Sequence, residues 1–278
     1  MQGLFSGIES ALDTSNTKTE GNVVYLEHLI SPKVAILAAP RCFMSRLIHP
    51  DLVSFGLLAN LNGLKHRGLF DDVDGVIDVG ANIGQFAFMA HFVWPHIPIY
   101  SFEPDRVCFT QLERNFERHT ILGSCFQIAL SDIAGHRKLF IYDNSANNSF
   151  LKRCDSEDSK KKQTEVITKT LDGLMEEISF PKMPLLKIDV QGFELSVIRG
   201  ARELLKRCKW VILEVSFQHS YQGNAHVADI FQMMRDNEFS CFDILDILRM
   251  PKTEGEGMRE ADLLFVNDNI GSGFQSKK

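Results

Sequence analysis

The feature that most constrains the fold is VIDVGANIGQF, which covers residues 76–86. Its first four residues form a short apolar run, typical of a buried parallel strand. Gly80 and Gly84 follow where the chain must turn sharply, and Phe86 begins a series of apolar residues at helical spacing. The segment therefore predicts a strand, a glycine turn and a helix, the unit from which α/β proteins with parallel sheets are built.

The same alternation continues along the chain. Further apolar runs occupy residues 97–102, 125–130, 185–190 and 210–215. Together with the helical segments between them, they predict a mostly parallel sheet with helices on both faces. Residues 138–142 follow the 125–130 run too closely for a helix between them, which indicates a hairpin or an edge strand. Residues 239–248 and 263–266 are expected to close the chain as an antiparallel pair.

Residues 1–70 precede this alternation and contain the apolar stretches 34–39 and 57–64, which indicate helices packed over the sheet. We therefore expect an N-terminal helical extension over residues 1–70 and a Rossmann-like domain over residues 71–270. Residues 144–163 are polar and mix both signs of charge towards their end, which predicts a solvated loop.

Composition excludes several classes of protein. The 278 residues carry 30 Lys and Arg against 36 Asp and Glu, so the chain lacks the excess of positive charge that general nucleic-acid binding requires. No apolar run reaches the length of about 18 residues that a membrane span needs, and the start of the chain does not resemble a signal peptide. The six cysteines form no C-x-x-C pair and indicate neither a zinc site nor a disulfide framework. We expect a cytoplasmic protein with neither a nucleic-acid nor a membrane partner.

The glycine turn lacks the signatures of two common phosphate-binding sites. Counting from Gly80 places Asn82 and Gln85 where the dinucleotide fingerprint requires its second and third glycines. No G-K-[ST] follows, which argues against a phosphate-gripping loop. Because the backbone at Gly80 is expected to approach a ligand, Gly80→Val should block ligand binding while largely preserving the fold.

Acidic residues at the strand ends indicate which ligand the turn holds. Glu103 ends the second run, where a carboxylate accepts hydrogen bonds from ribose hydroxyls. A ribose carboxylate without a phosphate fingerprint points to S-adenosylmethionine, whose sulfonium cation suits the acidic lining of Asp78, Glu103 and Asp189. For Asp78, ordering of the glycine loop through backbone N–H groups is an equally good interpretation.

The segment LLKIDVQGFELSVIRGA, residues 185–201, carries a second group of acids. Asp189 ends a strand and Glu194 begins a helix, so both carboxylates are expected to project into the crevice at the carboxyl edge of the sheet. An acid inside an otherwise apolar run needs a reason to be buried, and a cofactor or acceptor supplies one. We therefore expect Asp189 and Glu194 to be catalytic, with Asp189 also beside the cofactor.

At this point the sequence resembles a known family. VIDVGANIG, FEPD and LLKIDVQGFELSVIRGA together resemble the FkbM family of S-adenosylmethionine-dependent methyltransferases, and ALSDIAG, NNS and TLDGL support the resemblance across residues 71–266. It implies a Rossmann-like class I methyltransferase fold with a seven-stranded sheet whose last strand is antiparallel.

The resemblance also implies roles for particular residues. It assigns the methionine part of S-adenosylmethionine to Gly80, Asn82 and Gly84, the ribose to Glu103, and the adenine edge to Leu130 and Ser131. It further implies that the acceptor is a hydroxyl on a sugar, a polyketide or a related small molecule. The sequence after Ile188 supports this independently, because it lacks the Asp/Asn-Pro-Pro-aromatic tetrapeptide shared by methyltransferases that act on DNA bases.

Methylation of a hydroxyl needs a base or a metal ion to remove the proton. His219, just past the 210–215 run, is the sharpest base candidate because its ordinary pKa lies near neutral pH. Alternatively, Asp189, Glu214 and His219 would chelate a divalent cation. Two other functions stay open at this point, a nucleotide-cofactor oxidoreductase and a non-catalytic nucleoside-binding protein. Neither the acceptor nor the oligomeric state follows from the sequence.

Overall fold

The computed structural model describes residues 54–154, 162–250, 254–255 and 257–271, and the fold is built from these residues. Seven strands form the main sheet, in the order β3 (Gly123–Phe126), β2 (Ile99–Phe102), β1 (Gly75–Val79), β7 (Pro184–Ile188), β8 (Trp210–Ser216), β10 (Met258–Asn267) and β9 (Phe239–Arg249). Neighbours from β3 to β8 pair in parallel, whereas β10 runs antiparallel to both β8 and β9. The predicted mostly parallel, seven-stranded sheet with an antiparallel last strand is confirmed.

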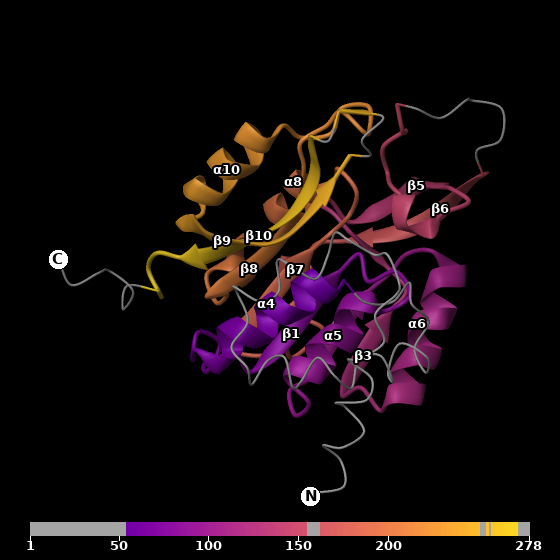
Figure 1. Ribbon diagram of the computed structural model, residues 1–278. Helices are drawn as coiled ribbons and strands as arrows, with labels where there is room; N and C mark the ends of the chain where they lie inside the picture. The colour runs from indigo at the N-terminus through magenta and orange to yellow at the C-terminus, as the bar shows by residue number, and fades with distance from the viewer. Residues whose placement is uncertain (1–53, 155–161, 251–253, 256, 272–278) are drawn as a thin grey trace, which may run out of the picture. The chain divides into compact units, whose positions relative to one another are not determined.

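Helices cover both faces of this sheet, as Figure 1 shows. One face carries α4 (Phe55–His66), α5 (Gln85–Val93) and α6 (Arg106–His119). The other carries α7 (Leu171–Leu174), α8 (Glu194–Arg199), α9 (Arg202–Leu205) and α10 (Val227–Asp236). Each face has its own hydrophobic core, because successive side chains of a strand point to opposite faces. In β1, Val76 belongs to the first core, and Ile77 and Val79 belong to the second.

The same alternation explains where polar residues gather. Asp78 lies between two buried residues of the α7–α10 core and therefore points to the α4–α6 face. Lys187 on β7 pairs in register with Asp78, and Ser101 on β2 does so on the other side. All three side chains are at least nine-tenths buried. The carboxyl ends of three adjacent strands thus form a polar row on the α4–α6 face.

A second, three-stranded sheet stands beside the main one, above α6 in Figure 1. It contains β4 (Ala129–Leu130), β6 (Lys162–Lys169) and β5 (Gly135–Ile141), in that order. The expectation of a single strand over residues 125–130 is therefore wrong, since its first half belongs to the main sheet and its second half pairs with β6.

The strand β6 also corrects part of the expected polar loop. It pairs antiparallel with β5 over residues 162–168, and alternate residues, Val166 and Thr168, are buried. Only its first two residues, Lys162 and Gln163, fall within the expected loop. Residues 164–169 were not predicted as a strand, because this strand is polar on its exposed side and its alternation is weak. Residues 155–161, the middle of the charged stretch, lie outside the described residues.

The helix α4 packs on the same face as α5, and its leucines contribute to the α4–α6 core. Just after it, the Phe70 ring lies edge-on against Trp94 and Trp210, at centroid separations of 5.4 and 5.3 Å. Asn60 of α4 donates a 2.6 Å hydrogen bond to the carbonyl of Leu245 on β9. Residues 1–53, including the apolar stretch 34–39, lie outside the described residues.

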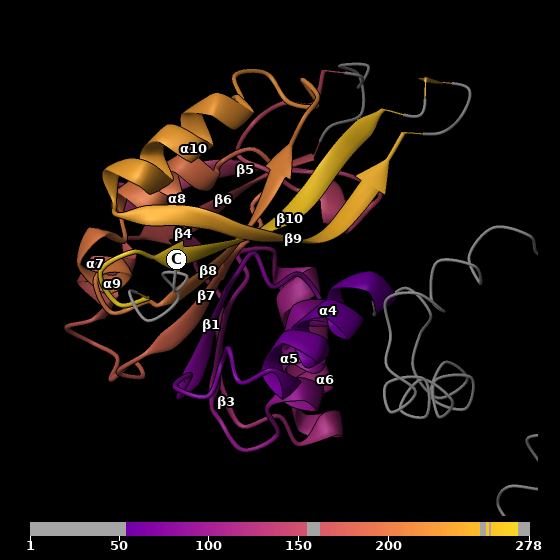
Figure 2. The ribbon, with the colours of Figure 1, turned by 60° about the vertical axis from the view of Figure 1, so that its left-hand side comes forward.

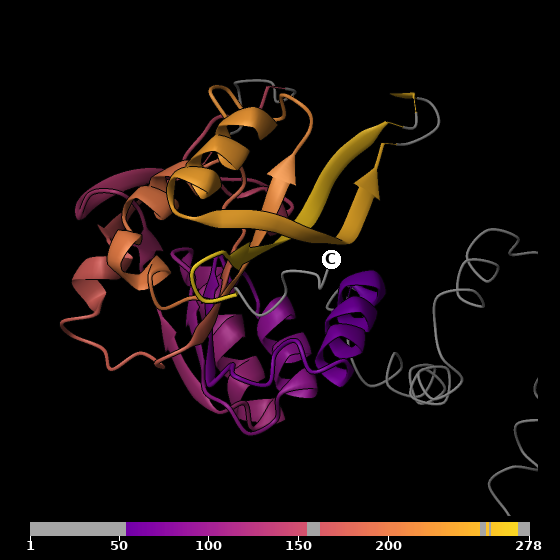
Figure 3. The same ribbon diagram turned by 90° about the vertical axis from the view of Figure 1, so that its left-hand side faces the viewer.

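The two last strands, β9 and β10, extend beyond the rest of the sheet as a twisted ribbon, which Figures 2 and 3 show from two sides. In both views α4 lies on the side of this ribbon that faces α5. Ser54, the N-cap of α4, hydrogen-bonds the carboxylate of Asp246 on β9. Within the described part of the chain, no helix is long and apolar enough to cross a membrane.

Candidate active site

A cavity of about 440 Å³ opens at the carboxyl ends of β1, β2, β7 and β8. The strand order reverses between β1 and β7, and open α/β sheets bind their ligands at this kind of switch point. Its size falls within the range of about 300 to 1,000 Å³ that is typical of small-molecule sites. Ser54 and Leu57 of α4 and Arg259, Glu260 and Asp262 of β10 complete the lining.

The glycine turn closes one side of the cavity. Gly80 and Ala81 both donate to the carbonyl of Phe102, each at 3.0 Å. Gly80 has a φ of +80°, and a Cβ built there would lie 1.8 Å from the carbonyl oxygen of Asp189. The expectation that Gly80→Val would spare the fold is therefore wrong, because the obstacle to a side chain is the backbone after β7. Gly84, with φ +96°, begins α5 and does not line the cavity.

Glu103 follows β2 and lies on the cavity wall, only 6% exposed. Its two carboxylate oxygens accept backbone hydrogen bonds from Asn82 and Asp105, both at 2.8 Å. Burial raises the pKa of Glu103 to about 7, although these two hydrogen bonds lower it. Each oxygen still has a free lone pair, so the carboxylate can hold the glycine turn and accept from ligand hydroxyls as well.

The residues expected at the adenine edge divide between two environments. Leu130 lines the cavity together with Phe102 and Pro104, which gives that end an apolar surface. Ser131 is buried outside the lining, where its hydroxyl donates to Asp132 at 2.9 Å and its backbone N–H donates to Lys169.

Asp78 lies beneath the turn and does not line the cavity. One of its oxygens accepts a 3.2 Å hydrogen bond from Ser101, and the other accepts none from the described residues. Burial raises the pKa of Asp78 to about 6, against the lowering effect of the Lys187 ammonium. Among the described residues Asp78 accepts no hydrogen bond from a backbone N–H of the glycine turn and it does not line the cavity, so neither of its two expected roles is visible as a direct contact.

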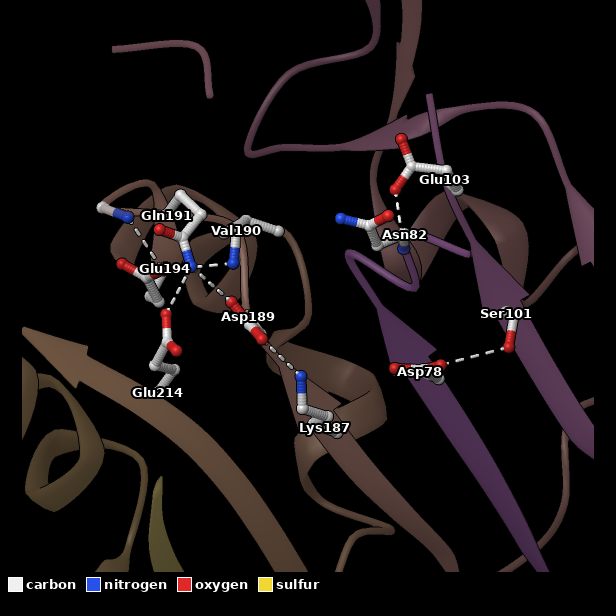
Figure 4. Close-up of polar contacts among 11 residues, drawn as sticks. Asp78, Asn82, Ser101, Glu103, Lys187, Asp189, Val190, Gln191, Glu194 and Glu214 are labelled. Carbon is white, nitrogen blue, oxygen red and sulfur yellow. Dashed lines mark hydrogen bonds and ion pairs between the residues drawn. The ribbon is translucent and has the colours of Figure 1, made fainter. Parts of the chain in front are cut away.

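Asp189 lies directly after β7 and lines the cavity. Figure 4 shows its carboxylate beside the Lys187 ammonium. Its Oδ2 accepts a 2.8 Å hydrogen bond from the Lys187 ammonium, and its Oδ1 accepts one of 3.0 Å from Gln191. Burial acts to raise the pKa of Asp189, but the positive charge of Lys187 outweighs it and leaves the pKa below its usual range. Asp189 is therefore an ionised carboxylate at neutral pH.

Glu214, near the end of β8, reaches the same place from the neighbouring strand and lines the cavity. The Nε2 atom of Gln191 donates to it at 2.6 Å and so bridges Glu214 and Asp189 (Figure 4). Burial and the negative charge of Asp189 raise the pKa of Glu214 well above its usual value. The negative charge of the pair therefore resides on Asp189, and burial disfavours a second charge on Glu214.

Glu194 is placed differently from the sequence expectation. It begins α8, but its Oε1 accepts from the backbone N–H groups of Val190 and Gly192, at 3.2 and 3.0 Å. The carboxylate thus turns back onto the loop that precedes its own helix and does not line the cavity. Its position supports ordering of the loop that carries Asp189, not projection into the crevice.

His219 is likewise not brought to the cavity. It is exposed, and its ring lies edge-on against His226 with centroids 4.8 Å apart. Among the described residues no three His, Cys, Asp or Glu side chains are grouped so that they could hold a metal ion. Asp189, Glu214 and His219 therefore do not form the expected chelating group.

Residues 144–149, which we call the strap, form a further wall that was not predicted. All six strap residues line the cavity. Ser145 donates to the side chain of Asn82 at 3.1 Å, and the Ser149 hydroxyl donates to the carbonyl of Gln191 at 2.7 Å. The Tyr221 hydroxyl lies 3.0 Å from the carbonyl of Asn147. The NNS motif belongs to this strap, which was its only sequence signal.

The charges of the lining suit a cationic ligand. The cavity wall carries the acids Glu103, Asp189, Glu214, Glu260 and Asp262 against the bases Lys187 and Arg259. Lys187 is engaged by Asp189, and Arg259 is paired with Glu260 at 3.3 Å. A nucleoside with a sulfonium and an ammonium group would complement this wall, whereas a pyrophosphate would be repelled. The residues present therefore fit S-adenosylmethionine.

The sheet order and the acidic cavity at its switch point are the features expected of an S-adenosylmethionine-dependent methyltransferase. The model of the Methyltransferase FkbM domain family matches residues 78–241, more than half of the chain. The protein belongs to this family, and the oxidoreductase and non-catalytic alternatives are thereby set aside.

Similar proteins include other methyltransferases. The 31-O-demethyl-FK506 methyltransferase FkbM of Streptomyces tacrolimicus is 29% identical over 204 residues, which cover 64% of this chain and 76% of that protein. The 2-O-methyltransferase NoeI of Sinorhizobium fredii is 24% identical over 57% of this chain and 70% of its own length. Among solved structures, magnesium protoporphyrin IX methyltransferase of Synechocystis PCC 6803 with bound S-adenosylmethionine gives a TM-score of 0.44 at 12% identity, over 76% of this chain and 80% of that chain.

Proposed function

We propose that the protein methylates a hydroxyl oxygen of a small molecule, with Asp189 as the group that accepts the hydroxyl proton. The observation that carries this proposal is the ionised Asp189 carboxylate on the cavity wall, fixed at both oxygens. S-adenosylmethionine supplies an electrophilic methyl group when bound. What the chain must add is a position for the hydroxyl and a destination for its proton.

Asp189 suits this task although its pKa is low. A carboxylate that is ionised before the reaction is available as a proton acceptor, and the proton is transferred as the new carbon–oxygen bond forms. Burial and the charge of Asp189 raise the pKa of the neighbouring Glu214, which disfavours a second negative charge at the same place. His219 lies outside the lining, so the geometry favours Asp189 over His219 for this role.

The end of the cavity formed by β8 and β10 supports a hydroxyl-bearing acceptor. Glu214, Glu260 and Asp262 line it from β8 and β10, and carboxyl groups accept hydrogen bonds from hydroxyl donors. Two similar proteins carry O-methylation in their names, the FK506 enzyme and NoeI. A sugar, polyketide or related metabolite with free hydroxyls is therefore the acceptor class that we propose.

The end of the cavity beside the glycine turn would hold the cofactor. We propose that Glu103 accepts from the ribose, that Gly80 and Asn82 face the methionine part, and that Leu130 contacts the adenine. These residues all line the cavity. Gly84 and Ser131 would act indirectly, through the start of α5 and the buried end of β4.

The test is an acceptor screen with the full chain. Sugars, glycosides and polyketides with free hydroxyls are incubated with S-adenosylmethionine, and release of S-adenosylhomocysteine is measured together with the methylated product. For an accepted compound, Asp189→Asn should lower kcat by about 10² to 10⁴ with little change in S-adenosylhomocysteine affinity.

His219→Ala is the matched comparison and should keep most of the wild-type rate. A loss in His219→Ala as large as that in Asp189→Asn would return the base role to the histidine. The rate should also be insensitive to a chelator, because no step of the proposal uses a metal ion. Methylation confined to amine acceptors would contradict the proposal as a whole.

A further inference from the structure

We propose that Gln191 is a positioning residue that aims the Asp189 carboxylate and ties it to the strap. This inference rests on the proposed function, because it concerns the group that we assign to the proton. Gln191 lies two residues after Asp189, in the loop between β7 and α8, and it lines the cavity. Figure 4 shows its side chain between Asp189 and Glu214.

The backbone of Gln191 is held in an unfavourable conformation. Its φ is +54°, in the left-handed region that non-glycine residues other than Asn and Asp seldom adopt. Such strain persists where surrounding contacts determine the conformation, and it concentrates at functional sites. Gly192 follows with φ +95°, so the chain makes a tight left-handed turn immediately after Asp189.

The side-chain amide uses both of its N–H groups on the two acids. Nε2 donates to Asp189 Oδ1 at 3.0 Å and to Glu214 Oε2 at 2.6 Å. The other oxygen of Asp189 is bound by Lys187 at 2.8 Å. Lys187 keeps the carboxylate ionised, whereas the neutral amide of Gln191 adds mainly direction. With one donor on each oxygen, the plane of the carboxylate is fixed.

Two further polar atoms of Gln191, its Oε1 and its backbone carbonyl oxygen, connect the two acids to the strap. Its Oε1 accepts from the Tyr221 hydroxyl at 3.0 Å, and its backbone carbonyl accepts from Ser149 at 2.7 Å. The same Tyr221 hydroxyl lies 3.0 Å from the carbonyl of Asn147. A hydroxyl has a single proton, so Tyr221 can serve the strap or Gln191 at any moment but not both. The position of the strap and the direction of Asp189 are thereby coupled through Gln191.

A pair of cofactor analogues reports where the carboxylate points without requiring the acceptor. S-adenosylhomocysteine has a neutral sulfur, whereas sinefungin carries an amine in place of the methyl sulfonium. A carboxylate aimed at the methyl position should favour the cationic analogue. The ratio of the two Kd values, from calorimetry on the full chain, therefore measures the placement of Asp189. Partial unfolding weakens both ligands alike and leaves the ratio unchanged.

Gln191→Gly removes the amide and also relieves the left-handed backbone strain. We expect its preference for sinefungin to fall by about tenfold, a loss equivalent to one hydrogen bond to a charged group, while its S-adenosylhomocysteine affinity stays near wild type. Thr120→Gly is the matched control, because Thr120 also has a left-handed φ of +54° but is exposed at the end of α6. It should leave the ratio unchanged. Tyr221→Phe should reduce the ratio by less than Gln191→Gly does.

An unchanged ratio in Gln191→Gly, with a reduced ratio in Asp189→Asn, would overturn the inference and leave the proposed function standing. Equal ratios in the wild type and Asp189→Asn would show that Asp189 does not face the methyl position. That result would contradict the proposed function itself. The two failures are therefore distinguishable.

Discussion

At the scale of single residues, Glu103 combines two tasks in one carboxylate. It orders the glycine turn by accepting from Asn82 and Asp105, and it is proposed to accept from the ribose. Its position at the end of β2 was predictable from the sequence, because the strand run and the following FEPD are local signals. The backbone contacts were not predictable, since they depend on how the turn after β1 folds against β2.

Glu103→Ala should therefore weaken both ligand binding and the fold. Each lost hydrogen bond between the carboxylate and a ribose hydroxyl is worth about 1.5 to 3 kcal/mol, so the Kd for S-adenosylhomocysteine should rise at least about tenfold. The melting temperature should fall too, because two buried N–H groups lose their acceptor. Calorimetry and thermal unfolding measure the two effects. Asp105→Asn is the control, since asparagine also caps helices well and Asp105 does not line the cavity. An unchanged Kd in Glu103→Ala would remove the ribose assignment.

Gly80 has a structural role, whereas the sequence had suggested that its missing side chain makes room for a ligand. A Cβ at Gly80 would overlap the Asp189 carbonyl, so Gly80→Ala should lower the free energy of unfolding by more than about 3 kcal/mol. Gly63→Ala is the matched comparison, because Gly63 is helical and a Cβ there meets nothing within 4 Å. It should stabilise α4 by up to about 1 kcal/mol. Urea unfolding of both variants tests the pair. A Gly80→Ala protein as stable as the wild type would contradict the predicted overlap.

At the scale of elements, α4 belongs to the methyltransferase core although it precedes the first strand of the sheet. Leu57, Leu58, Leu61 and Leu64 are buried, and Ser54 and Leu57 also line the cavity. The sequence boundary at residue 71 would separate this helix from the domain on which it packs. The apolar stretch 57–64 already predicted a helix packed over the sheet, but its spacing does not show which residues of the sheet and of α5 that helix contacts.

A chain that begins at residue 71 should therefore fail to fold, whereas one that begins at residue 54 should keep the fold. Each buried leucine contributes about 1.5 to 3 kcal/mol, so losing four approaches the whole stability of a typical domain. Circular dichroism and gel filtration compare the two truncated chains. Leu61→Ala in the full chain is a milder test, with an expected loss of about 2 to 5 kcal/mol. Cooperative unfolding of the 71–278 chain close to that of the 54–278 chain would contradict the shared core.

At the scale of the whole molecule, buried carboxyl groups should make stability depend on pH. Burial raises the pKa of Asp78 to about 6 and those of Glu103, Glu194 and Asp262 to about 7. Between the ordinary pKa near 4 and these values, the folded state holds protons that the unfolded state has released. The stability that these four groups contribute is therefore fully present below about pH 4, and this contribution is lost as the pH rises through 6 and 7.

The free energy of unfolding should thus fall between pH 5 and pH 8, by at least about 1.4 kcal/mol, the equivalent of one pKa unit. His119 opposes this trend, because burial lowers its pKa, but it is a single group against four. The lowered pKa of Asp189 acts only below its ordinary value of 3.8. Urea unfolding at constant ionic strength without ligand measures the slope, and Asp262→Asn should make it shallower. Stability that rises from pH 5 to pH 8 would contradict the prediction.

Most of the main sheet follows from local patterns in the sequence. The apolar runs, the glycine turn and the helical periods predicted β1, β2, β7 and β8 and the antiparallel β9–β10 pair. It also placed Glu103 and Asp189 at strand ends. These features depend on neighbours along the chain, because strand and helix periods express which face of a local segment is buried.

Features that depend on partners distant in the sequence could be seen only once the chain was folded. The polar strand β6 forms because β5 and β4 offer it pairing edges, which its own residues do not announce. Glu194 turns onto backbone amides and His219 turns outward, whereas Gln191 joins two acids from neighbouring strands. The direction of a side chain after a strand end is set by the loop that follows, and that loop is shaped by hydrogen bonds to other elements. Residue type and spacing can place a group at the edge of a sheet, but the packed chain alone determines where it points.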